Sequence, residues 1–157
     1  MHEQQFLALV TQHEGIIHKV CRLYRNTRED REDLFQEIVF QVWKALPGFE
    51  GRAKITSWMY RIALNTAMST YRKRTAPVSY VEHLPDYADV HNDTEEQRRE
   101  QMMQALQQLS DIEKAVITLY FEDLSYDEIA EITGMNAGHV GVRLHRIKTK
   151  LQKLLKA

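Results

Sequence analysis

Residues 124–151 have the sequence LSYDEIAEITGMNAGHVGVRLHRIKTKL. Ser125 followed three residues later by Glu128 is a capping box, which predicts that a helix begins there. Gly134 can adopt the left-handed conformation that ends a helix, and Asn136 can cap the helix that follows. That second helix carries an apolar stripe at helical spacing, formed by Val140, Leu144, Ile147, Leu151 and Leu154. Two helices joined by a short glycine-containing turn predict a helix-turn-helix.

The second helix of a helix-turn-helix enters the major groove of DNA and contacts base edges with its N-terminal residues. If the apolar stripe faces the core, the opposite side of this helix points outward. Arginine can donate to guanine or to phosphate, and histidine can donate to either. The alternative is an ordinary helical hairpin with a basic surface. We predict DNA contacts from Asn136, Gly138, His139, Val142, Arg143 and Arg146.

The charges are distributed unevenly, although the net charge is only −1. Residues 51–74 carry six basic and no acidic side chains, and so do residues 132–157. Between them, residues 75–131 carry three basic and fourteen acidic side chains. Two cationic segments separated by an acidic one are typical of two polyanion contacts, although a charge run can also be only a solvated helix face.

The first cationic segment also contains aromatic residues, namely Phe49, Trp58, Tyr60 and Tyr71. Aromatic rings stack on unpaired bases while cations follow the phosphates, so this combination favours binding of single-stranded nucleic acid. A protein that binds only duplex DNA gains less from these rings. The alternative for each ring alone is a place in the core of the protein.

A helix is also predicted upstream, because Thr27 with Asp30 resembles a capping box and Pro47-Gly48 is a strong stop. Leu34, Ile38, Val42 and Leu46 recur at helical spacing on one face of it. A second apolar set, Phe35, Val39 and Trp43, lies beside that face. One small domain cannot readily bury both sets, which favours a partner that covers one of them. A central helix buried on all sides is the alternative.

The overall fold class predicted is all-α, with two small helical domains joined by a flexible linker. Glycine and proline are sparse, and no alternating β-branched run favours a sheet. Helical stripes occupy residues 6–24, where Gly15 interrupts, and 55–74, and capping patterns restart helices at Thr94 and Ser110. Residues 77–93 have no helical period and contain Pro77 and Pro85, which predicts the linker. The domains expected are therefore 1–76 and 94–157.

Several classes of chemistry are not supported by the sequence. The histidines and the single cysteine show no metal-ligand spacing, and there is no phosphate-binding glycine loop or nucleophile motif. We therefore expect no catalytic residue, no metal and no cofactor. Cys21 lies in an apolar stretch and is expected to be a buried structural thiol. Without a signal-peptide pattern or an apolar run near the about 18 residues of a membrane span, the protein is expected in the cytoplasm.

Nearly the whole chain resembles the extracytoplasmic-function group of bacterial sigma factors. Residues 33–43, DLFQEIVFQVW, resemble the region 2 helix that binds RNA polymerase. Residues 49–67, FEGRAKITSWMYRIALNTA, resemble the segment that melts promoters. Residues 109–130 and 140–151 resemble region 4. The short linker implies that region 3 is absent, as in this group.

The resemblance implies roles for particular residues. This protein would contact core RNA polymerase at its β′ clamp helices and its β flap. The residues that would contact the clamp helices are Asp33, Gln36, Glu37, Phe40 and Trp43. The loop with Phe49, Arg52 and Lys54 would hold a flipped base of the −10 element. Strand separation and backbone contact would involve Trp58, Arg61, Asn65, Arg72, Lys73 and Arg74. The last helix would contact the −35 element, and an anti-sigma factor would be a further partner.

The chain departs from this group at two places. Gly141 and Val142 stand where the group has a basic residue followed by serine, which removes a phosphate contact. The loop has Glu50 and Arg52 where roughly the opposite charges are expected. Both departures bear on which bases the protein would prefer in the −35 and −10 elements.

Two other functions fit part of the pattern. A stand-alone helix-turn-helix transcriptional regulator would bind duplex DNA but would not need the aromatic residues of segment 49–71. An interaction protein, such as a regulator-sequestering helical module, would show no salt-dependent affinity for DNA, whereas phosphate contacts require one. A nucleic-acid enzyme fits least, because acid/base and metal residues are lacking.

Overall fold

The computed structural model describes residues 2–52, 54–70 and 94–156. These residues form helices, turns and short loops, and no strand occurs among them, as the all-α prediction requires. The chain divides into two compact units, Met1–Lys73 and Arg74–Ala157. The predicted linker at 77–93 lies outside the described residues.

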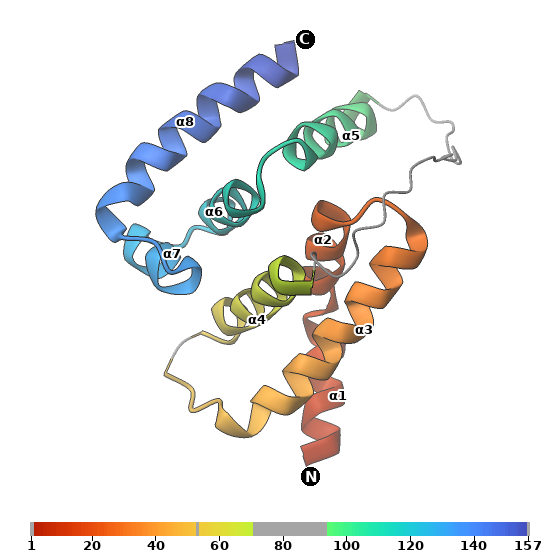
Figure 1. The fold of residues 1–157 in the computed structure, drawn as a ribbon. Helices are drawn as coiled ribbons and strands as arrows, with labels where there is room; N and C mark the ends of the chain where they lie inside the picture. The colour runs from red at the N-terminus through yellow and green to blue at the C-terminus, as the bar shows by residue number, and fades with distance from the viewer. Residues whose placement is uncertain (1, 53, 71–93, 157) are drawn as a thin grey trace. The chain divides into compact units, whose positions relative to one another are not determined.

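The first unit is a small helical bundle (Figure 1). It contains α1 (His2–Gln12), α2 (Glu14–Tyr24), α3 (Arg28–Ala45), the 3₁₀ turn η1 (Leu46–Gly48) and α4 (Ile55–Thr70). Helices α2, α3 and α4 all pack against one another. Thr27 caps α3 as predicted, since its Oγ1 accepts a hydrogen bond of 3.1 Å from the backbone N–H of Asp30. The interruption expected at Gly15 falls at His13, between α1 and α2.

The core of this unit forms where the predicted stripes of α2, α3 and α4 meet. Leu34, Ile38 and Val42 of α3 are buried, as their spacing indicates. From α4 the spacing predicted a stripe of Ile55, Met59, Ile62 and Thr66, but Ile55 and Ile62 are only half-buried and the buried set lies mostly elsewhere on the helix. The buried set comprises Ser57, Met59, Tyr60, Ala63, Leu64, Thr66 and Ala67. About half of the circumference of α4 is therefore buried, and this helix packs against both α2 and α3.

A buried arginine joins α2 to α4. Arg25 is only 7% exposed, although arginine is rarely buried. Its Nη2 donates to the carbonyl of Ala67, 3.1 Å away in the last turn of α4, and its Nη1 donates to the carbonyl of Tyr24 at 2.9 Å. Arg31 donates to the carbonyl of Arg25 at 3.0 Å. A cation at the C-terminal end of a helix is also favoured by the helix dipole.

Cys21 lies next to this arginine and is buried, as predicted for a structural thiol. Burial raises the pKa of the Cys21 thiol to about 11, against the opposing charges of Arg25 and Arg31, which lower it. At neutral pH the side chain is therefore a thiol that packs in the core, not a nucleophilic thiolate.

The second unit contains α5 (Thr94–Gln107), α6 (Asp111–Phe121), α7 (Tyr126–Thr133) and α8 (Ala137–Lys156). Helix α8 packs against α5, α6 and α7, and α6 packs against α7. Both predicted capping boxes are present, Ser110 with Glu113 and Ser125 with Glu128. Gly134 ends α7 with a φ of +82°, a conformation that favours glycine.

Each of the two helices of the helix-turn-helix buries one apolar face in the core of the second unit. Ile129 and Ile132 of α7 are buried, as are Val140, Leu144, Ile147 and Leu151 of α8. Leu154, the last member of the predicted stripe, is only half-buried, near the C-terminal end of α8. The predicted helix-turn-helix is confirmed in this unit.

Among the described residues, no helix is long and apolar enough to cross a membrane.

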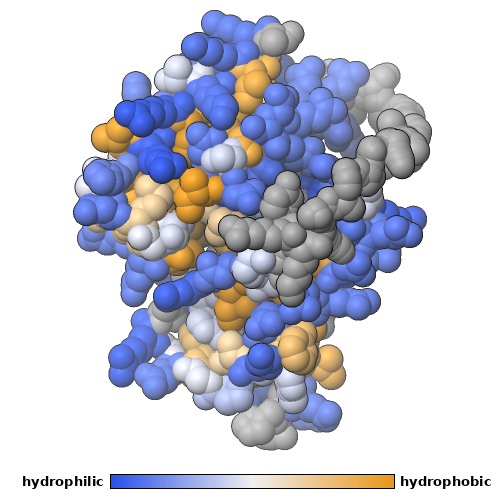
Figure 2. Space-filling view, in the orientation of Figure 1, coloured by the Kyte–Doolittle hydropathy of each residue, from blue (hydrophilic) through white to orange (hydrophobic). Residues whose placement is uncertain are grey.

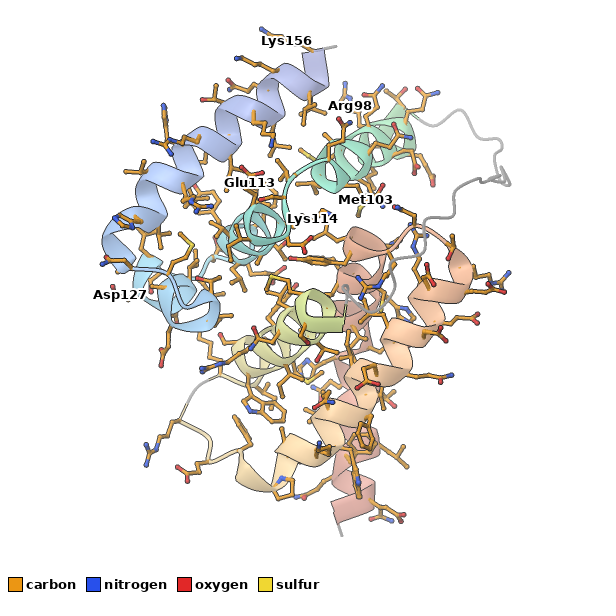
Figure 3. The ribbon with its side chains drawn as sticks, in the orientation of Figure 1. Arg98, Met103, Glu113, Lys114, Asp127 and Lys156 are labelled. Atoms are coloured by element: carbon orange, nitrogen blue, oxygen red, sulfur yellow. The ribbon has the colours of Figure 1, made fainter. Side chains whose placement is uncertain are left out.

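Glu113 links α6 to α8, toward which it points in Figure 3. Its Oε1 accepts from the backbone N–H of Ser110 at 2.9 Å and from Lys150 Nζ at 3.1 Å. Partial burial alone would raise the pKa of Glu113, but the hydrogen bonds from Ser110 and Lys150 and the charge of Lys150 outweigh burial and lower it. The charged form of Glu113 therefore stabilises the second unit.

We expect the Glu113→Gln variant to lose about 1 kcal/mol of unfolding free energy near neutral pH, since glutamine keeps the cap but loses the charge pair. The carboxyl of Glu113 has a lowered pKa in the folded state, so its contribution is present above the ordinary pKa of 4.5 and is lost as the pH falls through the lowered value. Urea unfolding of both proteins across the acidic range measures the difference. A difference that does not shrink in acid would contradict this assignment.

Candidate functional site

The outer face of α3 carries all the residues predicted to bind polymerase. Helical geometry places Asp33, Gln36, Glu37, Phe40 and Trp43 together on the side opposite Leu34 and Ile38. Phe40 is 52% exposed and Trp43 is 42% exposed, which is unusual for large apolar side chains. The five side chains therefore form one surface, which we call the α3 outer face.

Neighbouring groups cover part of this helix. The ring of Trp43 meets that of Phe6 edge-on, with centroids 5.0 Å apart, and the Phe35 ring stacks on His18 at 4.7 Å. Lys44 Nζ lies 5.4 Å from the centre of the Phe40 ring. The idea of a helix buried on all sides is therefore wrong: α1 and α2 cover Phe35 and one side of Trp43, and Phe40 stays exposed.

A second surface combines the loop after η1 with α4. Lys54, Trp58, Arg61 and Asn65 follow one another at spacings of four, three and four residues, so they lie along one side of α4. Lys54, Arg61 and Asn65 are exposed, while Trp58 is half-buried because Phe49 packs against it, with ring centroids 4.8 Å apart. We call this set, with Phe49, the α4 polar strip.

The loop itself is shaped by a glycine and an ion pair. Gly51 has a φ of +80°, which few other residues adopt without strain. Arg52 Nε lies 3.2 Å from Glu50 Oε1, and both side chains are largely exposed. The two loop residues that differ in charge from the expected pattern therefore neutralise each other, at a solvated pair that contributes little to stability.

One of the four aromatic residues takes the core position that was its alternative. Tyr60 is 1% exposed and belongs to the core, so it cannot stack on a base. The reason is its position two residues after Trp58, which places it on the opposite side of α4. Tyr71, Arg72, Lys73 and Arg74 lie outside the described residues.

The third surface is the outward side of α8. Gly138, His139, Val142 and Arg146 are exposed, and Arg143 is half-buried. Asn136 is exposed too and caps α8, since its Oδ1 accepts from the backbone N–H of Gly138 at 2.8 Å. Helical spacing places His139, Val142 and Arg146 opposite the buried stripe, and Arg143 at its flank. We call these four residues the α8 outer face.

The cations of α8 have two different roles. Lys148 Nζ donates to the hydroxyl of Tyr120 at 3.1 Å, and Lys150 pairs with Glu113 at 3.1 Å. These two lysines hold α8 against α6, a role that the sequence analysis did not identify. Within the described part of the chain, Arg143 and Arg146 have no carboxylate partner, so their charge is available to a polyanion.

Gly141 has a structural explanation. A Cβ atom at this position would lie 3.2 Å from Cε2 of Tyr126, closer than ordinary van der Waals contact. Glycine therefore lets the Tyr126 ring of α7 lie against the backbone of α8.

No cluster of three or more potential metal ligands is found within the described ranges.

Comparison with protein families supports two of the predicted regions. The family model described as "Sigma-70 region 2" matches residues 9–76, which include the α3 outer face and the α4 polar strip. The model described as "Sigma-70, region 4" matches residues 99–151, which include the helix-turn-helix. The two matches occur in the order predicted from the sequence.

Individual relatives agree with this assignment. The RNA polymerase sigma factor YlaC of Bacillus subtilis is 33% identical over 144 residues, which cover 83% of this chain and 82% of YlaC. The ECF RNA polymerase sigma factor SigW of the same organism is 27% identical, with 98% of this chain and 90% of SigW covered. A solved structure of the sigma factor RpoE with the anti-sigma factor NepR from Bartonella quintana shares the fold, with a TM-score of 0.69, 23% identity and coverage of 99% and 96%. The chain therefore belongs to the extracytoplasmic-function group of the sigma-70 family of bacterial RNA polymerase sigma factors.

Proposed function

We propose that this chain directs core RNA polymerase to specific promoters and helps to melt them, without catalysing a reaction itself. The observation that carries the proposal is the α4 polar strip in one unit together with a helix-turn-helix in the other. The first suits an unpaired strand and the second suits duplex DNA. A factor that opens promoters needs both, whereas a stand-alone duplex-binding regulator needs only the second.

The α3 outer face is the proposed docking surface for the β′ clamp helices of polymerase. Exposed aromatic side chains at the centre of a polar face are typical of the residues that contribute most to protein association. Phe40 and Trp43 are the exposed aromatic side chains of this face, and Asp33, Gln36 and Glu37 lie on their N-terminal side along α3. The β flap is proposed to contact the second unit.

The loop that contains Phe49, Arg52 and Lys54 is the proposed site for a flipped base of the −10 element. Extrusion of a base costs a few kcal/mol, and stacking on an aromatic ring returns about 1–3 kcal/mol per base. The pairing of Phe49 with Trp58 supplies aromatic surface beside the loop. Arg61 and Asn65 are exposed on the same side of α4, where they can contact the backbone of the separated strand.

The α8 outer face is proposed to contact the −35 element in the major groove. Asn136, Gly138 and His139 lie at the N-terminal end of α8, the part that reaches base edges in a helix-turn-helix. Arg143 and Arg146 supply charge for phosphate or guanine. We further propose that the protein works in the cytoplasm and that an anti-sigma factor binds it, as NepR binds RpoE in the structure of that complex.

The direct test is transcription from a randomised promoter library with purified core polymerase, with and without this protein. We expect a defined set of promoters to be transcribed only when the protein is present. Core polymerase alone is the control for background initiation. A protein that fails to bind core polymerase, yet binds an intact duplex tightly, would be the stand-alone regulator instead.

A further inference from the structure

Val142 is an apolar side chain in the middle of a cationic surface. It is 51% exposed, on the same side of α8 as His139, Arg143 and Arg146. It is one of a small number of large apolar side chains with this degree of exposure among the described residues. On the side shown in Figure 2, most of the surface is hydrophilic, with apolar groups in small scattered patches.

The residues around Val142 leave about half of it uncovered. Side chains on a helix lean toward its N-terminus, so the isopropyl group extends over the preceding turn. In that turn, Gly138 stands four residues before Val142 and has no side chain to cover it. Gly141, immediately before Val142, is also bare, and its space is used by the Tyr126 ring.

This location lies near the N-terminal end of the second helix of the helix-turn-helix, which is the part that reaches base edges. In the major groove, thymine presents a C5-methyl group, and apolar side chains recognise thymine by contact with it. Arg143 and Arg146, adjacent to Val142 on the helix surface, supply hydrogen-bond donors for phosphate or guanine, whereas the thymine methyl group is recognised by apolar contact.

We propose that Val142 is a specificity-determining residue that selects thymine at one position of the −35 element by contact with its C5-methyl group. The inference rests on the proposed function, because it requires that α8 enters the major groove. It goes beyond that function in naming the base, the atom recognised and the side chain that recognises it.

The test uses the full protein bound to core polymerase and the −35 sequence selected from a randomised library. Each thymine of that element is replaced in turn by deoxyuridine, which lacks only the methyl group. For the wild-type protein we expect one substitution to weaken binding about fourfold, the loss that corresponds to one buried methyl group. In the Val142→Ala variant that same substitution is expected to have no effect.

Two further variants complete the design. Leu155→Ala removes another exposed apolar side chain of α8, far from its N-terminal end, and should keep the full deoxyuridine effect. Val142→Thr keeps one of the two methyl groups and should retain part of it. Helical content of each variant, measured by circular dichroism, confirms that α8 is formed.

The possible results separate the two proposals. If the wild-type holoenzyme selects an element but no deoxyuridine weakens binding, or if the loss persists in Val142→Ala, the inference is wrong and the proposed function stands. If the protein selects no element at all, both are wrong. An effect that disappears only in Val142→Ala supports the inference.

Discussion

Replacing Phe40 with glutamate is expected to weaken binding to core RNA polymerase by about thirtyfold or more, the loss typical of a central aromatic contact. Phe40 is 52% exposed in the middle of the α3 outer face, so a partner that docks there must cover it. A glutamate would lose the apolar contact and would bring a carboxylate into the interface beside Glu37. Both effects weaken association.

The fold of the variant should be preserved. The Phe40 ring points away from the core, and a glutamate at position 40 would stand four residues before Lys44, a spacing that favours a helical ion pair. We expect the unfolding free energy to change by less than about 0.5 kcal/mol. Binding is measured by titration of fluorescently labelled protein with core polymerase.

The control for this prediction is the Leu7→Glu variant. Leu7 is 61% exposed on α1 and does not belong to the α3 outer face, so its substitution adds the same charge elsewhere. Wild-type affinity in Phe40→Glu would contradict the proposed docking surface. An equal loss in both variants would show that added negative charge, not the position of Phe40, weakens binding.

Replacing Arg25 with alanine is expected to lower the unfolding free energy by about 2–4 kcal/mol, because the buried carbonyls that it satisfies lose their donor. The affected groups are the carbonyls of Ala67 and Tyr24, and the link between α2 and the last turn of α4 is lost with them. Urea unfolding, followed by circular dichroism, measures the change.

Arg28→Ala is the matched control for Arg25→Ala. Arg28 lies three residues further along the chain, its side chain is 90% exposed, and it pairs with Glu32 at 3.6 Å. Exposed pairs of this kind contribute about 0.2–1 kcal/mol, so the control should lose little stability. If the two variants lost the same unfolding free energy, the hydrogen bonds of Arg25 across the bundle would contribute no more to stability than an exposed ion pair.

The ends of the helices were predictable because their signals are local. Thr27, Ser110, Ser125 and Asn136 cap helices in the structure as the sequence indicated. Each cap joins atoms two or three residues apart, so neighbouring residues suffice to predict it. The apolar stripes of α3 and α8 were predictable for the same reason, since helical period alone decides which residues share a face.

The candidate site was predictable where spacing alone decides it, and not where packing does. The spacing of Lys54, Trp58, Arg61 and Asn65 places them on one side of α4. It does not reveal that Tyr60 is needed in the core, or that Phe49 packs against Trp58. These outcomes depend on which face of α4 the helices α2 and α3 cover. The exact domain boundaries and the individual polymerase and DNA contacts remain predictions.

The sequence by itself therefore determined the all-α class, the helix-turn-helix and the resemblance to sigma factors, since these depend on periodicity, caps and short motifs. Only the tertiary structure decided that Arg25 bonds to Ala67, 42 residues further along the chain, that Lys148 and Lys150 pack against α6, and that Gly141 makes room for Tyr126. The physical reason is distance along the chain. Contacts between residues far apart in sequence form only when whole helices pack, and they decide which cations stabilise the fold and which stay available to DNA.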